Sequence, residues 1–349
     1  MRKRRISQPV HIGSVQVGGD APIVVQSMTK TDTRDVRSTV NQIKELQDLG
    51  CEIIRVAVPD QQAADAILQI KKKISIPLIA DIHFDYRLAL AAMDNGVDGL
   101  RLNPGNIRNP DHIKKIVIVA RNRSIPIRIG VNFGSLPQDK RGKLPTVSYM
   151  VKLAMDQVRL LESLDFNLIK IALKAFDVPT TVAAYRSIAR RTSYPLHIGI
   201  TEAGLPVTGM IRSSVGIGIL LYDGIGDTIR VSLSSHPRDE VFAAYEILKS
   251  LNLREHGPVL VSCPSCGRSE TDILGLAQTV SEYLQDIKKP IKVAVMGCVV
   301  NGPGEARDAD VGIACGKGRG AIFKKGKVVK TVEENQFLQS IIQEISSLP

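Results

Sequence analysis

The chain has 349 residues, of which 44% are apolar and 23% charged, a composition typical of soluble globular proteins. Its formal net charge of +11 indicates an affinity for anions without saying which ones. We expect no nucleic-acid partner, because the chain has no basic patch interleaved with aromatic residues and no known nucleic-acid-binding motif.

Up to about residue 250, short β-branched runs alternate with amphipathic stretches. The expected strands are 23–27, 52–58, 77–82, 99–103, 126–131, 168–174, 195–200 and 227–233. Helical periodicity is clear at 36–49 and at 150–164. This alternation predicts parallel strands joined by crossover helices, and eight such units fit a (β/α)8 TIM-type barrel. The alternative is an open doubly wound sheet, which would normally carry a glycine-rich phosphate turn after its first strand.

The pattern changes after Leu251, where 254–258 reads as a linker. The remainder predicts a small α+β domain. Its expected strands are 259–262, 291–296, 311–314 and 321–323, with helices at 270–287 and 333–348. We therefore expect two domains, 1–253 and 258–349. A bound cluster or a partner would help to stabilise so small a C-terminal domain.

Enzymes built on this barrel carry their chemistry at the carboxyl ends of the strands. The polar residues expected there are Gln26, Ser27, Thr29, Arg55, Asp81, His83, Arg101, Asn103, Arg128, Asn132, Lys174, His197, Thr201, Glu202, Arg230 and Ser232. Five of the eight strands deliver a cation, and each of these could form a structural ion pair with Asp81, Glu202 or Asp227. Three acids cannot neutralise five cations, so the excess favours a ligand with several negative charges, and a diphosphate fits best. Glu202 is a candidate general acid or a partner for one of the cations.

The chain has five cysteines. The basic start of the chain is not followed by an apolar stretch, and no run of about 18 apolar residues exists, so we expect no signal peptide and no membrane span. In the expected compartment, the cytoplasm, the cysteines are reduced and serve metal or redox chemistry.

Three of the cysteines have the spacing of a metal site. Cys263 and Cys266 form a C-x2-C pair, Cys298 follows the next expected strand, and Glu305 ends the same glycine-rich run. This set favours an iron–sulfur cluster with one iron not held by cysteine, and zinc is the alternative. Cys315 is expected to be a small core residue, although it could be a fourth cysteine ligand.

From these residues alone, two other functions stay open. One is a phosphate-binding barrel lyase or aldolase, with Lys174 as a Schiff-base residue and a zinc-stapled C-terminal domain. The other is a basic nucleic-acid-binding protein with a zinc module, which the barrel rhythm and the scarcity of aromatic residues disfavour.

Six segments carry a family resemblance. They are 26–29 (Gln-Ser-Met-Thr), 100–106, 128–136, 197–204, 262–268 (Ser-Cys-Pro-Ser-Cys-Gly-Arg) and 296–306 (Met-Gly-Cys-Val-Val-Asn-Gly-Pro-Gly-Glu-Ala). Together they resemble the 4-hydroxy-3-methylbut-2-enyl diphosphate synthase family in its bacterial two-domain form, over nearly the whole chain. The last two segments are the most specific.

The resemblance implies a cofactor and a substrate. The cofactor is a [4Fe–4S] cluster held by Cys263, Cys266, Cys298 and Glu305. The substrate is 2-C-methyl-D-erythritol 2,4-cyclodiphosphate, which is reduced to (E)-4-hydroxy-3-methylbut-2-enyl diphosphate in the non-mevalonate (methylerythritol phosphate) pathway of isoprenoid synthesis. The family usually has a small residue at position 315, so Cys315 stays an alternative to Glu305 as the fourth ligand.

The resemblance also implies residue roles and partners. The implied diphosphate contacts are Arg55, Arg101, Arg128, Asn132, Lys174 and Ser232. The electron donor is a flavodoxin or a ferredoxin, and the protein is a homodimer in which the cluster domain of one protomer caps the barrel of the other. Our hypothesis is that Glu305 gives up its place on the cluster to the substrate while Glu202 protonates the departing hydroxyl.

Overall fold

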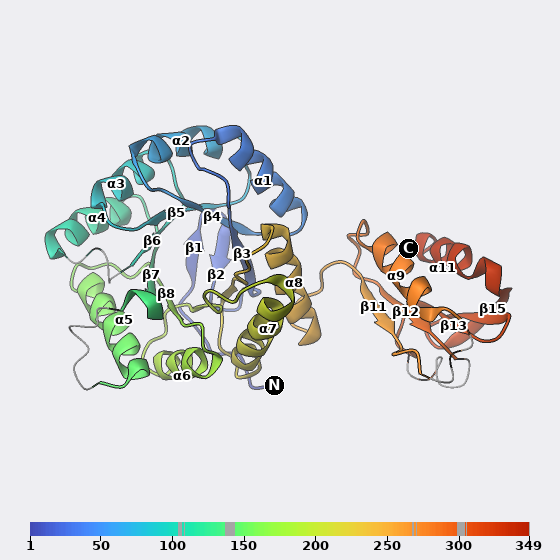
Figure 1. The fold of residues 1–349 in the computed structure, drawn as a ribbon. Helices are drawn as coiled ribbons and strands as arrows, with labels where there is room; N and C mark the ends of the chain where they lie inside the picture. The colour runs from blue at the N-terminus through green and yellow to red at the C-terminus, as the bar shows by residue number, and fades with distance from the viewer. Residues whose placement is uncertain are drawn as a thin grey trace. The chain divides into compact units, whose positions relative to one another are not determined.

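The computed structural model describes residues 1–103, 107, 109–136, 144–266, 269, 271–298, 304 and 306–348. Two compact units, Met1–Arg254 and Glu255–Pro349, each have their own sheet and core (Figure 1). None of the helices in the described part of the chain combines the length and the apolar character needed to cross a bilayer.

The first unit is a closed barrel of eight parallel strands. The strands are β3 (Val24–Met28), β4 (Ile53–Ala57), β5 (Leu78–Ile82), β6 (Gly99–Leu102), β7 (Ile127–Asn132), β8 (Ile169–Lys174), β9 (His197–Ile198) and β10 (Thr228–Ile229). They are paired in the order β8-β7-β6-β5-β4-β3-β10-β9, and a bridge between Ile171 and Leu196 closes the ring. The predicted TIM-type barrel is confirmed, and the open sheet is wrong.

Strands β9 and β10 are shorter than expected from the runs 195–200 and 227–233. A β-carbon at Gly199 would collide with the carbonyl oxygen of Arg230. Glycine at position 199 therefore lets the two backbone segments pass close to each other, and the N–H of Arg230 still donates to the carbonyl oxygen of Ile198 at 3.1 Å just beyond the two short strands.

Eight helices of the described residues surround the barrel, as the ribbon in Figure 1 lets the reader follow. They are α1 (Val36–Asp48), α2 (Gln61–Lys71), α3 (Tyr86–Asp94), α4 (Pro110–Asn122), α5 (Thr146–Glu162), α6 (Val178–Ala189), α7 (Pro206–Tyr222) and α8 (Pro237–Ser250). Side-chain caps begin several of them, as where Asp60 Oδ1 accepts from the backbone N–H of Ala63 at 2.9 Å. Apolar stripes such as Val40, Ile43 and Leu46 of α1 pack against the outward faces of the strands.

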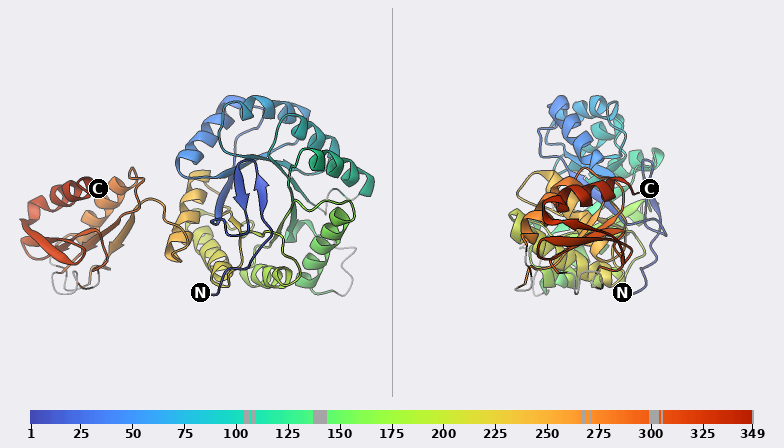
Figure 2. Two further views of the ribbon diagram at one scale, coloured as in Figure 1. Left: turned by 180° about the vertical axis from the view of Figure 1, so that it is seen from behind. Right: turned by 90° about the vertical axis from the view of Figure 1, so that its right-hand side faces the viewer.

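A β-hairpin that the sequence did not predict covers the amino end of the barrel. Strands β1 (Val10–Ile12) and β2 (Val15–Val17) pair antiparallel and lie in front of the barrel strands when the molecule is seen from behind (Figure 2). Ile12 and Val17 pack against an apolar layer formed by Val24, Ile53 and Ile79. The barrel interior is thus apolar at its amino end.

The second unit is a five-stranded sheet with helices packed on it. Its elements are β11 (Val259–Ser262), α9 (Ile273–Leu284), β12 (Lys292–Met296), β13 (Val311–Cys315), β14 (Arg319–Lys324), β15 (Lys327–Glu333) and α11 (Phe337–Ser346). Strands β11, β12 and β13 are parallel, and β14 and β15 continue the sheet antiparallel. Helices α9 and α11 share one core with these strands.

Strand β15 is the element of this unit that the sequence did not predict. It follows a tight turn in which Lys325 and Gly326 have positive φ angles of 47° and 75°. Six of its seven residues are exposed or half-buried, so it carries no alternation of apolar and polar residues. The final helix begins at Phe337, four residues later than the expected 333–348.

Candidate active site

Alternation along the barrel strands sends charged residues into the barrel interior. In β7, Ile127, Ile129 and Val131 belong to the core between strands and helices, so Arg128 and Asn132 face the interior. The same alternation turns charged residues of β5, β6 and β8 inward. Because these strands are neighbours in the sheet, their inward residues become lateral neighbours.

The register places Asp81, Arg101, Arg128 and Lys170 in one continuous row. Asp81 is opposite Arg101, Arg101 opposite Arg128, and Arg128 opposite Lys170. All four are buried, with exposed fractions of 3%, 5%, 4% and 1%. A row of one carboxylate and three cations inside a protein has a strongly positive potential and favours an anionic ligand.

Asp81 neutralises part of this charge. One of its oxygens lies 3.0 Å from Arg101 Nη1 and 3.6 Å from His83 Nε2, and the other lies 3.4 Å from Arg55 Nε. Burial alone would raise the pKa of Asp81, but Arg55, His83 and Arg101 outweigh it and hold the pKa below its ordinary value. Asp81 is therefore ionised at neutral pH.

The other acids pair differently from what the sequence suggested. Asp227 contacts Arg4 and Arg5 of the N-terminal segment, at 3.1 and 3.6 Å. Glu240 of α8 lies 3.4 Å from Arg230 and 3.1 Å from Lys30, and it accepts from the backbone N–H of Leu233 at 3.1 Å. Neither acid pairs with the cations of the inward row.

Arg128 and Lys174 make no ion pair within the part of the chain that the structure describes. The Nε of Arg128 is buried without a hydrogen-bond partner. Burial, followed by Arg55 and Arg101, lowers the pKa of Arg128 well below its ordinary value. A guanidinium nevertheless keeps its proton in proteins, so the unfavourable charge is available to an incoming anion.

Arg55 also lacks strong acceptors on one side. Its Nε and Nη2 lie 3.2 and 2.9 Å from the sulfur of Met28, which is a weak acceptor. Burial is the main reason why its pKa falls to about 10. An anion could replace the thioether as the acceptor with a gain in hydrogen-bond strength.

Glu202 lies at the same end of the barrel, in the loop after β9. It is exposed and has a φ of +56°, a left-handed conformation that is strained for a residue other than glycine and is often found at functional sites. A β-carbon at Gly134 would lie 3.8 Å from Glu202 Oε1, so the carboxylate lies beside the loop that follows β7. Asn132 ends β7 and is half-buried opposite Lys174 of β8.

Ser232 is half-buried in the loop that follows β10. Glu240 holds this loop through the N–H of Leu233, and Lys30 donates to the carbonyl oxygen of Leu233 at 2.6 Å. The six predicted diphosphate contacts therefore all lie on, or directly after, β4, β6, β7, β8 and β10.

Lys170, Lys30 and Glu240 belong to this constellation and were not predicted. Alternation could have found Lys170, because it precedes Lys174 by four residues on one strand and so faces the same way. Glu240 gave no such signal, because it lies on a helix and contacts the strand ends only in the folded chain.

The cysteines lie at the carboxyl end of the second sheet. Cys263 directly follows β11 and Cys298 follows β12, and these two strands are parallel neighbours. The backbone N–H of Gly297 donates to Cys263 Sγ at 3.1 Å, and a β-carbon at Gly297 would lie 3.2 Å from the same sulfur. Cys266 is exposed. This set of thiols, with a backbone donor aimed at one of them, fits a thiolate-bound cluster.

Glu305 lies outside the described residues, and no group of three metal-ligating side chains occurs among the described ones. Cys315 is fully buried in the core shared with α9 and α11. Burial raises the pKa of its thiol to about 12, which favours an uncharged core side chain.

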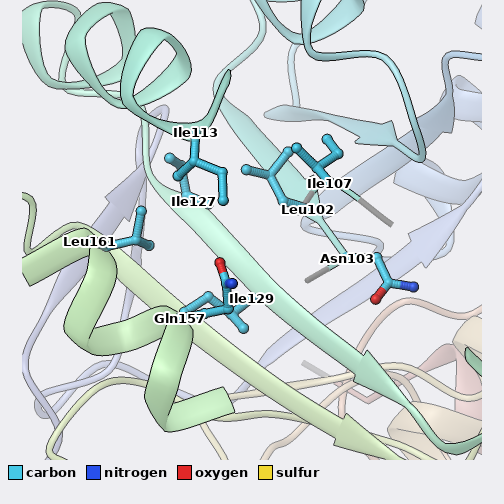
Figure 3. A pocket seen from close by; sticks show the side chains of 8 residues that line it. All are labelled: Leu102, Asn103, Ile107, Ile113, Ile127, Ile129, Gln157 and Leu161. Carbon is cyan, nitrogen blue, oxygen red and sulfur yellow. The ribbon is translucent and has the colours of Figure 1, made fainter. Parts of the chain in front are cut away.

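A small cavity lies on the helix side of the barrel wall and not at this site (Figure 3). It is lined by Leu102, Asn103, Ile107, Ile113, Ile127, Ile129, Gln157 and Leu161. Its lining is mostly apolar and comes from the outward face of β6 and β7, the segment after β6, and helices α4 and α5. The inward cations are on the opposite face of these strands, so the cavity is not part of the anion site.

These features define a class of protein: a (β/α)8-barrel enzyme with a cluster of buried cations toward the carboxyl end of the barrel, joined to a cysteine-bearing α+β unit. Residues 7–245 match the GcpE TIM-barrel domain, and residues 259–347 match the GcpE protein C-terminal domain. The chain therefore belongs to the GcpE family, and the family resemblance of its motifs is confirmed.

Curated relatives cover the chain from end to end. A protein of Dehalococcoides mccartyi is 61% identical over 100% of both chains, one of Thermodesulfovibrio yellowstonii is 54% identical over 99% of both, and one of Geobacter sulfurreducens is 55% identical over 98% of both. All three are named 4-hydroxy-3-methylbut-2-en-1-yl diphosphate synthase (flavodoxin).

Solved structures with a similar fold are much more distant in sequence. Dihydropteroate synthase from Stenotrophomonas maltophilia has a TM-score of 0.53 at 13% identity, covering 70% of this chain and 98% of that one. The enzyme from Yersinia pestis has a TM-score of 0.52 at 10% identity, covering 70% and 99%. At this identity the likeness concerns the fold alone.

Proposed function

We propose that the chain catalyses the reductive ring opening of 2-C-methyl-D-erythritol 2,4-cyclodiphosphate to (E)-4-hydroxy-3-methylbut-2-enyl diphosphate. It is an oxidoreductase of isoprenoid biosynthesis by the methylerythritol phosphate pathway. Two electrons and two protons enter, the C–O bond that closes the ring breaks, and one hydroxyl leaves as water. The observation that carries the proposal is the excess of buried cations at the carboxyl end of the barrel, in a member of the GcpE family.

The barrel binds the diphosphate in this proposal. Arg55, Arg101 and Arg128 offer guanidinium forks, which suit phosphate oxygens, and Lys174 adds a point charge. The half-buried Asn132 and Ser232 supply uncharged donors at the rim of the same site. Binding is favoured because the unpaired charges of Arg128 and Lys174 are already desolvated, so the protein does not have to lose water from them.

Glu202 is the proposed proton donor to the departing hydroxyl. Its exposed carboxylate, its strained backbone and its position beside the loop after β7 support a role at the mouth of the barrel. The Glu202→Gln variant should keep its iron content and lose most of its turnover. Full turnover in that variant would contradict the assignment.

The second unit is proposed to hold a [4Fe–4S] cluster through Cys263, Cys266, Cys298 and Glu305. Such a cluster supplies single electrons at low potential when it is bound. The N–H of Gly297 that points at Cys263 Sγ would stabilise the thiolate form of that ligand. The proposed electron donor is a flavodoxin, as in the names of the curated relatives. Cysteines that bind a cluster as thiolates suit the reducing cytoplasm, which is the proposed compartment.

A homodimer is part of the proposal, and helix α7 supports it. Val207, Ile211 and Val215 follow one another at spacings of four residues on one face and are 74%, 61% and 49% exposed. Tyr222 continues this face at 55% exposure. An uncharged apolar stripe of this length on a surface helix is typical of a protein–protein interface.

The test begins with anaerobic purification followed by iron, sulfide and zinc analysis. About four irons and four sulfides per chain, with absorbance near 400 nm, are expected. The holoprotein should then convert the cyclodiphosphate with reduced flavodoxin. About one zinc per chain, without iron after reconstitution, would instead identify the cysteines as ligands of a structural zinc ion and contradict the proposed activity.

A further inference from the structure

The amino group of Lys174 has an unusual partner for a buried cation. Lys174 is 6% exposed, and its Nζ lies 3.2 Å from Nε2 of His197, which is fully buried. Arg55 and Arg101, by contrast, are paired with the carboxylate of Asp81. Lys174 is therefore held by an imidazole where a carboxylate would be the common solution.

The hydrogen bonds of His197 determine how its ring is protonated. Its Nδ1 lies 2.7 Å from the hydroxyl oxygen of Thr228, which is also fully buried. Burial, followed by Lys174 and Arg128, lowers the pKa of His197 well below its ordinary value, so the ring is neutral. Burial, followed by Arg128 and two further arginines, also lowers the pKa of Lys174 well below its ordinary value. A bound polyanion favours the ammonium form of Lys174, and an ammonium can only donate hydrogen bonds. Nε2 must then accept from Lys174, and Nδ1 must carry the proton and donate it to Thr228 Oγ1.

The surroundings fix the ring and the lysine relative to each other. The hydroxyl of Tyr185 donates to the carbonyl oxygen of His197 at 2.5 Å and accepts from the N–H of Leu173 at 3.1 Å. It thereby links β9 to the residue that precedes Lys174 on β8. A β-carbon at Gly199 would lie 2.7 Å from Lys174 Nζ, so the absence of a side chain there leaves room for the ammonium.

We propose that His197 is a positioning residue that holds the ammonium of Lys174 without neutralising it, so that its full charge serves a diphosphate-bearing ligand. The inference rests on the proposed function, because it requires that the barrel binds a polyanion. A carboxylate in place of the ring would fix Lys174 equally well, but it would cancel the charge and repel the ligand. In its neutral Nδ1–H tautomer, His197 fixes the position of Lys174 and leaves the charge of Lys174 uncancelled.

The first experiment measures binding of inorganic pyrophosphate to the full-length protein by calorimetry. In His197→Gln an amide oxygen replaces Nε2 as a neutral acceptor, and in His197→Glu a carboxylate replaces it. We expect His197→Gln to stay within about threefold of the wild type and His197→Glu to bind on the order of tenfold or more weakly. Circular dichroism and thermal melting confirm that the variants are folded.

Lys174→Met provides the matched control. In that background, changing His197 to Gln should make no further difference to pyrophosphate affinity, because the group that His197 positions is gone. Changing His197 to Glu should cost less affinity than it does in the presence of Lys174, because only the repulsion of the ligand remains and no cation is neutralised. A purely structural role of His197 would instead show the same penalty with and without Lys174, and that result would overturn the inference.

The second experiment reads the tautomer directly in wild-type protein labelled with 15N-histidine. Six histidines are present, and the His197→Gln spectrum identifies the signals of His197. We expect a neutral Nδ1–H ring between about pH 6 and about pH 8, with the Nε2 signal moving when pyrophosphate is added. An Nε2–H tautomer or an imidazolium would overturn the inference even if His197→Glu does not fold.

The two proposals fail in different ways. If the wild-type protein does not bind pyrophosphate, the proposed function is contradicted. The inference about His197 is then contradicted too, because it requires a diphosphate-bearing ligand. If the wild-type protein binds pyrophosphate, and His197→Gln and His197→Glu bind it equally well, only the role of His197 is contradicted.

Discussion

Arg101 and Arg128 are neighbours in the barrel but differ in their electrostatic surroundings. Arg101 lies 3.0 Å from Asp81, whereas Arg128 has no ion pair among the described residues. Removing an unpaired buried charge relieves an unfavourable energy, whereas breaking a buried pair leaves its partner uncompensated. The same substitution should therefore have opposite effects on stability at these two positions.

We expect Arg128→Met to raise the free energy of unfolding of the ligand-free protein by about 1–2 kcal/mol, and Arg101→Met to lower it by about 3 kcal/mol. Both variants should bind pyrophosphate more weakly than the wild type. Urea unfolding and calorimetric titration measure the two effects. A loss of stability in Arg128→Met as large as that in Arg101→Met would contradict the description of Arg128 as unpaired.

His197 gives a pH dependence of stability. Its pKa in the folded protein lies well below the ordinary value of 6.5, mainly because of burial. Between these two values the unfolded chain binds a proton that the folded protein does not bind. The free energy of unfolding contributed by this group is therefore fully present above pH 6.5 and falls below it, by up to about 1.4 kcal/mol per pH unit.

The His197→Gln variant should remove this contribution. Its stability should decline less steeply than that of the wild type when urea unfolding is followed from about pH 7 down to about pH 5. His83 is exposed, and His83→Gln serves as the control for replacing a histidine outside the buried interior. If the free energy of unfolding falls equally steeply with decreasing pH in the wild type and in His197→Gln, His197 is not held neutral in the folded protein.

At the scale of the residue, the sequence predicted the site better where charge lies on strands than where it lies on helices. Arg55, Arg101 and Arg128 could be found because a charge interrupts an apolar strand. Glu240 is on a helix, where a charge is ordinary, and only the folded chain brings it to Arg230 and Lys30. The neutral partner of Lys174 likewise depends on the closure of the barrel between β8 and β9, which no local pattern reveals.

Helix α7 is the element whose exposed apolar residues are unusual for a chain that stays monomeric. Its exposed face carries Val207, Ile211 and Val215, and a change to a charged residue there should cost the fold little because these side chains face outward. In a homodimer the same change would bury an unpaired charge in the interface.

We expect the wild type to sediment at about twice the 38.0 kDa mass of the chain, and Ile211→Glu combined with Val215→Glu to sediment as the monomer. Leu68→Glu on α2 is the matched control, because Leu68 is an exposed apolar residue on another barrel helix, at 45%. A dimer that survives the α7 changes would place the interface elsewhere, and a monomeric wild type would remove the dimer from the proposal.

The predicted elements were found where hydrophobic periodicity is long. All eight barrel strands lie within the expected runs or one residue beyond them, because each run buries β-branched side chains against the helices. The hairpin β1–β2 was missed because strands of three residues are too short to show alternation. Strand β15 was missed because it is largely exposed and rich in lysine.

At the scale of the whole molecule, the two units divide the proposed work. The anion-binding cations all belong to Met1–Arg254 and the cysteines of the cluster site to Glu255–Pro349, and each unit has a separate core. Damage to one site should therefore leave the fold of the other unit intact, since each unit is stabilised by its own core.

Cys266→Ala should lose most of its iron and keep the pyrophosphate affinity of the wild type, because Cys266 is exposed and lies in the second unit. Arg128→Met should keep its iron and lose pyrophosphate affinity. Metal analysis and calorimetry on the same preparations test both halves. Loss of pyrophosphate binding in Cys266→Ala would mean that the cluster ligands also shape the anion site.

The hairpin β1–β2 has a kinetic consequence. Because the hairpin covers the amino end of the barrel, we expect a ligand to enter and leave the interior at the carboxyl end. The proposed product keeps the diphosphate of the proposed substrate, so the cations that draw one in also hold the other back. We therefore expect the product to compete with the substrate for the same cations, and to leave slowly when it accumulates.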